Sequence, residues 1–401
     1  MVFPRIATDD TIYLDHAATT PVDPEVVAAM LPYFGERYGN PSSVYRLGQE
    51  ARADLDQARA TVARVLECDP AEVVFTSGAT ESNNLALHGV AWAHRLAHPD
   101  GPPSHIVTTA IEHHAVLHAA EALVEQGFAV TVVPCDAAGI VAPRDIDAAL
   151  RPETCLVSVM YANNEVGSVQ PLAAIGVLAR ARGIPFHTDA VQAAGALPLR
   201  VDDLQVDLVS LSAHKFYGPK GVGVLFARRG TSLAWNHQQA GGGQEGGRRG
   251  GTENLPLIVG LAVALAKAER LRPAYAAHCA GLRDRMFAGV REAVPDIELN
   301  GPSDPSLRLP NNLNVAVPGV QGETVLLGLD LLGIAASAGS ACTTGNSEPS
   351  HVLRAMGLTD ERSRASLRFT MGRDTTADEV DEAVDALAET AARARDLVGV
   401  A

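Results

Sequence analysis

The stretch VDLVSLSAHKFYGPKGVGVLF, residues 206–226, decides the fold class of this chain. Two apolar runs within it, Val206–Ser212 and Val222–Phe226, have the length and composition of buried strands. A polar segment that contains His214 and Lys215 separates them. A lysine directly after a buried strand is a candidate for Schiff-base chemistry, because desolvation favours its neutral, nucleophilic amine.

The chain before this stretch repeats an alternation of strand and helix patterns. Strand-like runs are expected at Val73–Thr76, His105–Thr109, Phe128–Val133, Leu156–Met160 and Ile184–His187. Between them, Ala115–Gln126 and Leu172–Arg182 have apolar residues at helical spacing, and a glycine follows each. Strands that alternate with helices predict βαβ units and a mostly parallel sheet.

The chain after about residue 258 has a different pattern. Two long helical stretches, 258–294 and 376–398, surround short strand-like pieces. We therefore predict an α/β protein with a large domain, in which helices sandwich a mostly parallel sheet, and a smaller α+β domain. The predicted large domain is 13–258, and the small domain combines 1–12 with 259–401.

Composition excludes several classes of protein. The chain has 401 residues, 47% of them hydrophobic and 20% charged, which is ordinary globular usage. The formal net charge of −15 argues against nucleic-acid and anionic-membrane partners. Neither a signal-peptide core in Met1–Asp10 nor a membrane-length apolar run is present, so a cytoplasmic location is expected. Five scattered cysteines without a C-x-x-C pair fit a reducing compartment and no metal site of the protein's own.

Lysine is scarce in this sequence. Only three of the 32 basic residues are lysines: Lys215, Lys220 and Lys267. Lys220 lies in a Gly/Pro turn and is expected to be solvated, whereas Lys267 lies on an amphipathic helix and is most simply a surface charge. Lys215 is therefore the preferred candidate for amine chemistry.

Polar residues follow each predicted strand, where an open parallel sheet binds its ligands. The small-residue turn Ser77–Glu81 opens a helix and could hold an anion or be only a capped turn. His113 and the segment Asn163–Glu165 could be functional or structural. Asp189 could face a protonated cofactor nitrogen or cap a helix. An anion cradle, an aspartate, a histidine and Lys215 at neighbouring strand ends together suit pyridoxal phosphate (PLP).

The segment 337–350 is small, polar and free of bulky apolar side chains. We expect a mobile surface loop, of the length usually reserved for function. Cys342 within it is expected to be exposed and reactive, whereas the other four cysteines are expected to be buried small hydrophobes.

Taken together, these residues resemble the cysteine desulfurases of the NifS/IscS type, in the class V aminotransferase branch of the fold-type I PLP enzymes. The resemblance covers nearly the whole chain and depends on several segments in combination. These are Tyr13–Pro21, Gly39–Ser43, Thr76–Ser82, Glu112–Val116, Asn163–Glu165, Asp189–Gln192, Ser212–Lys215, Gly241–Asn254, Gly339–Cys342, Glu348–Met356 and Arg368-Phe369.

The resemblance implies roles for individual residues. Lys215 would bind the cofactor as an imine, Asp189 would pair with its ring nitrogen, Gln192 with its ring hydroxyl, and His113 would stack on the ring and help to move protons. The phosphate would be held by Ala79, Thr80, Ser212, His214 and, from a second subunit, Thr252. Asn164 would contact cofactor and substrate, and Arg368 would bind the substrate carboxylate.

The implied reaction converts L-cysteine to L-alanine and leaves the sulfur on Cys342 as a persulfide. The persulfide would then pass to an acceptor, such as an Fe–S scaffold protein or a thiolation carrier, and Cys342 could transiently contact an Fe–S cluster. The shared phosphate site implies a homodimer.

Two alternatives stay open at this point. One is a selenocysteine lyase or another class V PLP enzyme that works without a thiol. The other is a non-catalytic protein that uses Gly241–Gly251, with Arg248 and Arg249, as an anion or RNA clamp, although the net charge argues against it.

Overall fold

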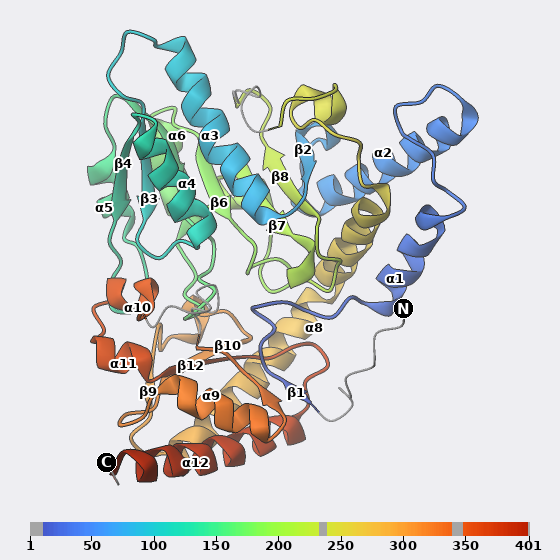
Figure 1. Ribbon diagram of the computed structural model, residues 1–401. Coiled ribbons are helices and arrows are strands. Elements are labelled where there is room, and N and C mark those ends of the chain that lie inside the picture. Colours follow the sequence, from blue (N-terminus) through green and yellow to red (C-terminus); the bar gives the residue numbers. More distant parts are fainter. Residues whose placement is uncertain (1–10, 232–238, 339–347, 400–401) are drawn as a thin grey trace.

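The computed structural model describes residues 11–231, 239–338 and 348–399. Its centre is a seven-stranded sheet in the order β2-β8-β7-β6-β5-β3-β4 (Figure 1). The strands are β2 (Val73–Thr76), β3 (His105–Thr109), β4 (Ala129–Val133), β5 (Thr154–Ser158), β6 (Phe186–Asp189), β7 (Leu208–Ser212) and β8 (Gly223–Ala227). Strands β4, β3, β5, β6 and β7 are parallel, so the predicted α/β fold class with a mostly parallel sheet is confirmed.

Strand β8 departs from the parallel pattern. It is antiparallel to both β7 and β2. The connection from Ser212 to Gly223 is too short for the crossover that a parallel pair requires, so the chain turns back as a hairpin. This hairpin positions Lys215 at the edge where the parallel strands end.

Helices cover both faces of the sheet because side chains alternate along each strand. The helix layer on one face consists of α3 (Ala79–Ala97) and α4 (His114–Glu125). It packs against the strand residues Val74, Ile106, Leu156 and Leu208. Their strand neighbours pack on the other face. That second layer contains α2 (Arg46–Leu66), α5 (Pro143–Ala149), α6 (Leu172–Ala181), α7 (Val201–Leu204) and the first part of α8 (Leu255–Ala293).

A second, smaller unit lies below the sheet in Figure 1 and has its own hydrophobic core. It contains the antiparallel sheet β12-β10-β9 and the parallel pair β1-β11. Its elements are β1 (Ile12–Tyr13), β9 (Glu298–Leu299), β10 (Asn312–Ala316), α9 (Gly322–Leu331), β11 (Ile334–Ala335), α11 (Asp360–Arg364), β12 (Ser366–Thr370) and α12 (Ala377–Gly399). Helix α10 (His351–Ala355) comes from the same part of the chain but packs in the large core.

The two cores do not divide at the predicted boundary between residues 258 and 259. Helix α8 is continuous, and its residues up to Leu265 pack in the large core whereas those from Cys279 pack in the small one. Leu14 belongs to the small core, and Val352 from α10 packs in the large one. Because one 39-residue helix serves both units, no chain break separates them.

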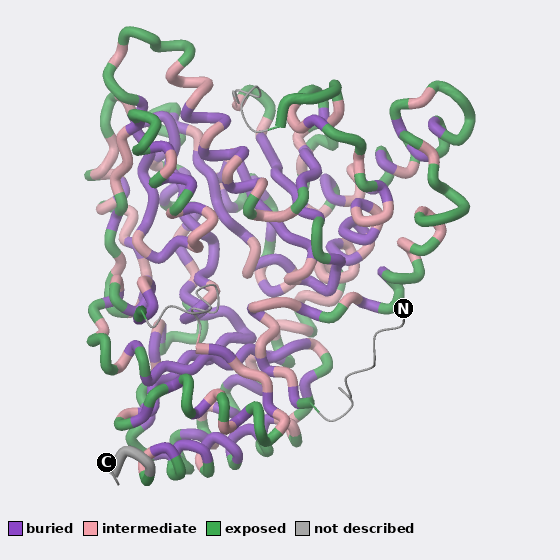
Figure 2. Tube along the Cα trace, in the orientation of Figure 1, coloured by how far each residue is buried: buried purple, intermediate pink, exposed green. Residues whose placement is uncertain are grey.

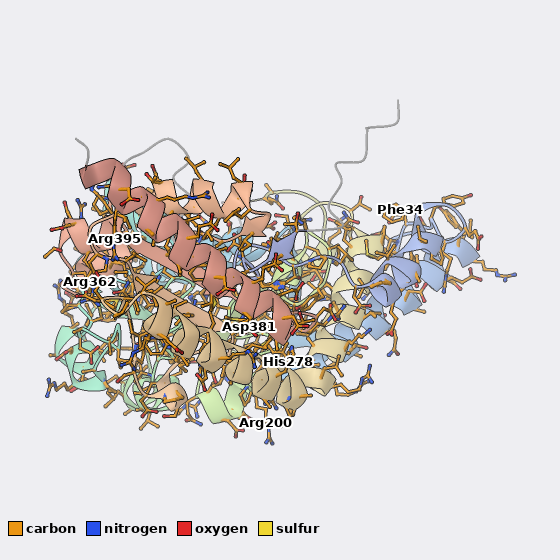
Figure 3. All side chains as sticks on the ribbon, turned by 90° about the horizontal axis from the view of Figure 1, so that it is seen from below. Phe34, Arg200, His278, Arg362, Asp381 and Arg395 are labelled. Atoms are coloured by element: carbon orange, nitrogen blue, oxygen red, sulfur yellow. The ribbon has the colours of Figure 1, made fainter. Side chains whose placement is uncertain are left out.

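The N-terminal arm, residues 24–47, is formed by α1 (Pro24–Met30), the turn after it and the start of α2. Large apolar side chains are unusually exposed along it: Val27, Leu31, Phe34, Tyr38, Val44, Tyr45 and Leu47. The arm projects from the body of the protein with Phe34 near its outer end (Figure 3), and Figure 2 shows most of its surface as exposed. Contiguous exposed apolar side chains of this kind indicate an interaction surface.

Three residues differ from the sequence expectations. Cys155 and Cys279 are buried as predicted, but Cys68 and Cys135 are only partly buried. Lys267 is not a free surface charge, because its side chain is 18% exposed and pairs with both Asp23 and Glu25 at 2.9 Å.

No helix in the described part of the chain has both the length and the apolarity needed to cross a bilayer.

A buried ion cluster joins the two units. Asp23 is 2% exposed and accepts from Lys267 on α8 and from Arg373, which follows β12, at 2.9 and 2.5 Å. Arg373 also lies over the ring of Tyr217, 4.1 Å from its centroid. Burial raises the pKa of Asp23, but the hydrogen bonds from Lys267 and Arg373 outweigh burial and lower that pKa from 3.8 to about 2. The folded state therefore favours the charged form.

We predict that Asp23→Asn lowers the free energy of unfolding by about 2 kcal/mol at pH 7, while Asn retains the helix cap. Because the pKa of Asp23 is depressed, its contribution is complete above the unfolded value of 3.8 and disappears as pH falls toward about 2. Urea unfolding between pH 3 and pH 7 measures this. The control is Glu25→Gln, which removes the exposed partner of Lys267. An equal loss in both variants at pH 7 would contradict the prediction.

Candidate active site

One cavity of about 530 Å³ opens at the carboxyl ends of the parallel strands. Nine predicted site residues line it: Ala79, Thr80, His113, Asn164, Asp189, Gln192, Ser212, His214 and Lys215. Arg368 and Thr252 are not among its lining residues, and Cys342 lies outside the described residues. Parallel strands bring these side chains together because their carboxyl ends meet at one edge of the sheet.

The turn before α3 forms one end of the cavity. Gly78 occupies the cap position with φ 154° and offers no side-chain acceptor to the helix N-terminus. The β8 backbone approaches closely here, because a Cβ on Gly223 would lie 2.7 Å from Gly78. The exposed N–H groups and the helix dipole suit a phosphate group, with the Ser212 hydroxyl nearby.

Lys215 lies in the short helical turn Ala213–Lys215 that follows β7. Its Nζ donates to the carbonyl oxygens of Ala17 at 2.5 Å and Ala18 at 2.8 Å. Gln192 donates to the Ala17 carbonyl as well, at 3.1 Å. Neutral acceptors hold the amine inside the cavity, whereas Lys220 is exposed at its rim, as predicted.

Asp189 ends β6 and is 5% exposed. Its two carboxylate oxygens accept from the side-chain amide of Asn83, at 2.7 Å, and from the backbone N–H of Val191, at 3.0 Å. Sequence reasoning missed Asn83. Its position one helical turn after Ala79 was the available signal, because that spacing turns both residues to the same face of α3.

Two histidines flank the cavity in neutral form. His113 caps α4, with Nδ1 accepting from the N–H of Ala115 at 3.1 Å, and burial lowers its pKa. Burial, followed by the charge of Lys215, lowers the pKa of His214 to about 4. His113 therefore has the protonation state in which an imidazole can accept or relay a proton at neutral pH.

Arg368 on β12 reaches the large unit from the small one. Its guanidinium is 3% exposed and donates to the Asp15 carboxylate at 2.6 Å and the Asn164 carbonyl at 2.8 Å. Asp15 belongs to a segment quoted in the resemblance, but no role was assigned to it. A planar guanidinium held in this way has the geometry for binding a carboxylate.

Comparisons with known proteins show the family of this chain. The family model for class V aminotransferases matches residues 12–383. The chain belongs to the class V aminotransferase family. Relatives named cysteine desulfurase IscS, from Clostridium botulinum and Methanosarcina thermophila, are 44% identical over 386 residues and 45% identical over 394 residues. These alignments cover 96% of both chains in the first case, and 98% of this chain and 95% of the relative in the second.

A human cysteine desulfurase is 43% identical over 387 residues, which cover 96% of this chain and 83% of that protein. A solved NifS-like protein superposes with a TM-score of 0.88 at 36% identity, over 96% of this chain and all of that one. A second structure, SspA in complex with cysteine, has a TM-score of 0.76 at 35% identity and covers 91% and 99% of the two chains. The resemblance to the NifS/IscS type is confirmed.

In this class V family member, the glycine-rich segment Gly241–Gly251 forms ion pairs and hydrogen bonds with other parts of the same chain. Glu245 is buried and pairs with Arg59 at 2.6 Å. Arg249 pairs with Glu81 at 2.9 Å, and Arg248 donates to the Ala71 carbonyl at 2.7 Å. Internal partners for both arginines argue against the RNA-clamp alternative. Thr252, just beyond this segment, is exposed.

The ends of the segment 337–350 are not the surface loop that we predicted. Ser337 is buried and forms an antiparallel β-bridge with Arg368, in which each backbone N–H donates to the other residue's carbonyl oxygen. Ser350 is buried at the cap of α10 and donates to Glu165 at 2.5 Å. The composition of small polar residues could not reveal these partners, because both are distant in sequence.

Glu112, next to His113, is a buried acid that sequence reasoning left without a role. Its Oε1 accepts from the Thr109 hydroxyl at 2.6 Å and the Met160 N–H at 2.8 Å. Its Oε2 has no hydrogen-bond partner within the described ranges. Burial raises the pKa of Glu112 from 4.5 to about 8, so the carboxyl is largely protonated at neutral pH.

We predict that Glu112→Gln gains stability relative to the wild type as pH rises. A raised pKa means that the stabilising contribution is complete below 4.5 and is lost as pH approaches about 8. Glutamine mimics the protonated acid, so the difference in unfolding free energy should change by up to about 1.4 kcal/mol per pH unit in that window. Urea titrations at several pH values measure it. Glu121→Gln, on the exposed face of α4, is the control, and a pH-independent difference for Glu112→Gln would refute the prediction.

Proposed function

We propose that this protein is a PLP-dependent cysteine desulfurase, which converts L-cysteine to L-alanine and transfers the sulfur to Cys342. One observation carries the proposal: the Lys215 amine, the buried Asp189 carboxylate and the uncapped N-terminus of α3 open on one cavity. An amine, an anion and a phosphate-binding helix end match the aldehyde, the ring nitrogen and the phosphate of PLP. The names of the relatives support the same activity.

The cofactor supplies an electron-withdrawing ring that stabilises negative charge at the substrate Cα. The chain's own residues supply the rest. Lys215 would hold the cofactor through its amine, and the same amine would be placed to remove the Cα proton of the substrate. Asp189 stabilises positive charge on the ring nitrogen. Neutral His113 lies on the same cavity wall and relays a proton.

Arg368 and Asn164 orient the substrate. The ion pair with Asp15 holds the guanidinium of Arg368 in position. Asn164 lines the cavity, and its backbone carbonyl accepts a hydrogen bond from Arg368. A SspA structure containing cysteine, from a protein 35% identical to this one, supports cysteine as the substrate. The Cys342 thiolate then attacks the substrate sulfur. The C–S bond electrons go to Cβ, which takes up a proton and becomes the methyl group of alanine, and Cys342 keeps the sulfur as a persulfide.

We predict that Cys342→Ala abolishes sulfur release from L-cysteine but leaves cofactor binding intact. Removal of a reacting nucleophile is expected to lower the rate on the order of 10³-fold or more. The measurements are alanine and sulfide production, together with the visible absorption of the bound cofactor. Cys135→Ala, which removes a partly buried thiol elsewhere in the chain, is the control. Normal rates in Cys342→Ala would instead favour a lyase that needs no thiol, such as a selenocysteine lyase.

We also propose a homodimer, in which Thr252 of each subunit completes the phosphate site of the other. Two features support it: Thr252 is exposed, and the N-terminal arm presents apolar side chains to solvent. A sulfur-acceptor protein such as an Fe–S scaffold, and a cytoplasmic location, belong to the same proposal.

We predict that light scattering after gel filtration gives twice the mass of the chain. Replacing Phe34 and Tyr38, which are 64% and 69% exposed, by aspartate should produce a monomer, because charge opposes burial of the arm. Leu331→Asp, at an 87% exposed leucine on α9, is the matched control and should remain dimeric. A wild-type monomer with full activity would overturn the dimer.

A further inference from the structure

Asn83 lies behind the cofactor end of the cavity, on the second turn of α3. It is fully buried, and its Nδ2 donates to Asp189 Oδ2 at 2.7 Å. Its Oδ1 is buried and has no hydrogen-bond partner among the described residues. A buried amide costs free energy unless its groups are satisfied, so a half-satisfied amide at this place needs a reason beyond packing.

Asp189 accepts hydrogen bonds from two neutral donors. Its two oxygens accept from the side-chain amide of Asn83 and from the Val191 N–H. Hydrogen bonds that donate to a carboxylate favour its ionised form. Asn83 supplies one of these two bonds, and it is the one made by a side chain.

A second buried acid, Glu112, interacts with Asp189 and has a different set of hydrogen-bond donors. The charge of Asp189 contributes to raising the pKa of Glu112, after burial itself, so the two carboxyl groups interact. The two carboxyl groups differ in how their oxygens are held. Asp189 has a donor on each oxygen, whereas both donors of Glu112 serve Oε1.

We propose that Asn83 is a positioning residue for the cofactor: its hydrogen bond fixes the Asp189 carboxylate in one orientation, so that the carboxylate faces the ring nitrogen of PLP. The inference rests on the proposed function, because it concerns the same cofactor. Asn84, the next residue along, offers a contrast. Its amide donates to the Thr80 carbonyl within the same helix at 2.8 Å, whereas the amide of Asn83 donates to Asp189.

The test compares Asn83→Leu, which has a similar branched shape but no donor, with Asn84→Leu as the matched control. Asn83→Ala removes the same donor with a smaller side chain and serves if leucine prevents folding. PLP is titrated into each protein and followed by visible absorption. Loss of a hydrogen bond to a charged group should weaken PLP binding about 10- to 100-fold in the Asn83 variants and leave the control unchanged.

The decisive readout is the pH at which the visible absorption of the Lys215-bound cofactor changes. Positive charge on the ring nitrogen lowers the pKa of the nearby cationic linkage, so its loss should raise this midpoint by about one pH unit in the Asn83 variants. Weaker PLP binding with an unchanged midpoint would mean that Asn83 only packs against the site, and would overturn the inference. A wild-type protein that gains no visible absorption with PLP would overturn the proposed function, and this inference with it.

Discussion

The carboxyl ends of the parallel strands meet at one edge of the central sheet, and the chemistry of the protein depends on this constraint. Strands β3, β5, β6 and β7 each end there, and a different polar group follows each. The connection between β7 and the antiparallel strand β8 carries Lys215, which lies at the same edge. A buried sheet with this geometry positions an amine, a carboxylate and a helix N-terminus without a long loop.

The charges at this edge are balanced mainly by hydrogen bonds. Lys215 donates to two carbonyl oxygens, and Asp189 accepts from an amide and a backbone N–H. His113 is neutral because burial lowers its pKa. The amine and the carboxylate therefore lie on one cavity wall, each held in place by neutral hydrogen-bonding groups.

The small unit contributes Arg368 next to the cavity residue Asn164. Arg368 contacts Asp15 and the backbone of Asn164. The cluster of Asp23, Lys267 and Arg373 makes a second connection between the units. Helix α8 passes through both cores. These connections explain why the predicted domain boundary does not correspond to a separation in space: each unit contributes groups that the other needs.

Local patterns in the sequence determined the strands of the central sheet, several of the longer helices, the α/β class and the preference for Lys215, because periodicity and strand-end position depend on neighbouring residues. They could not reveal Asn83 as the partner of Asp189, Asp15 as the partner of Arg368, or Asp23 as the partner of Lys267. The members of these pairs lie 106, 353 and 244 residues apart, so only the folded chain brings them together. The tertiary structure therefore decided which charges are paired and which face the cavity, because burial and pairing depend on distances in space that the order of residues does not contain.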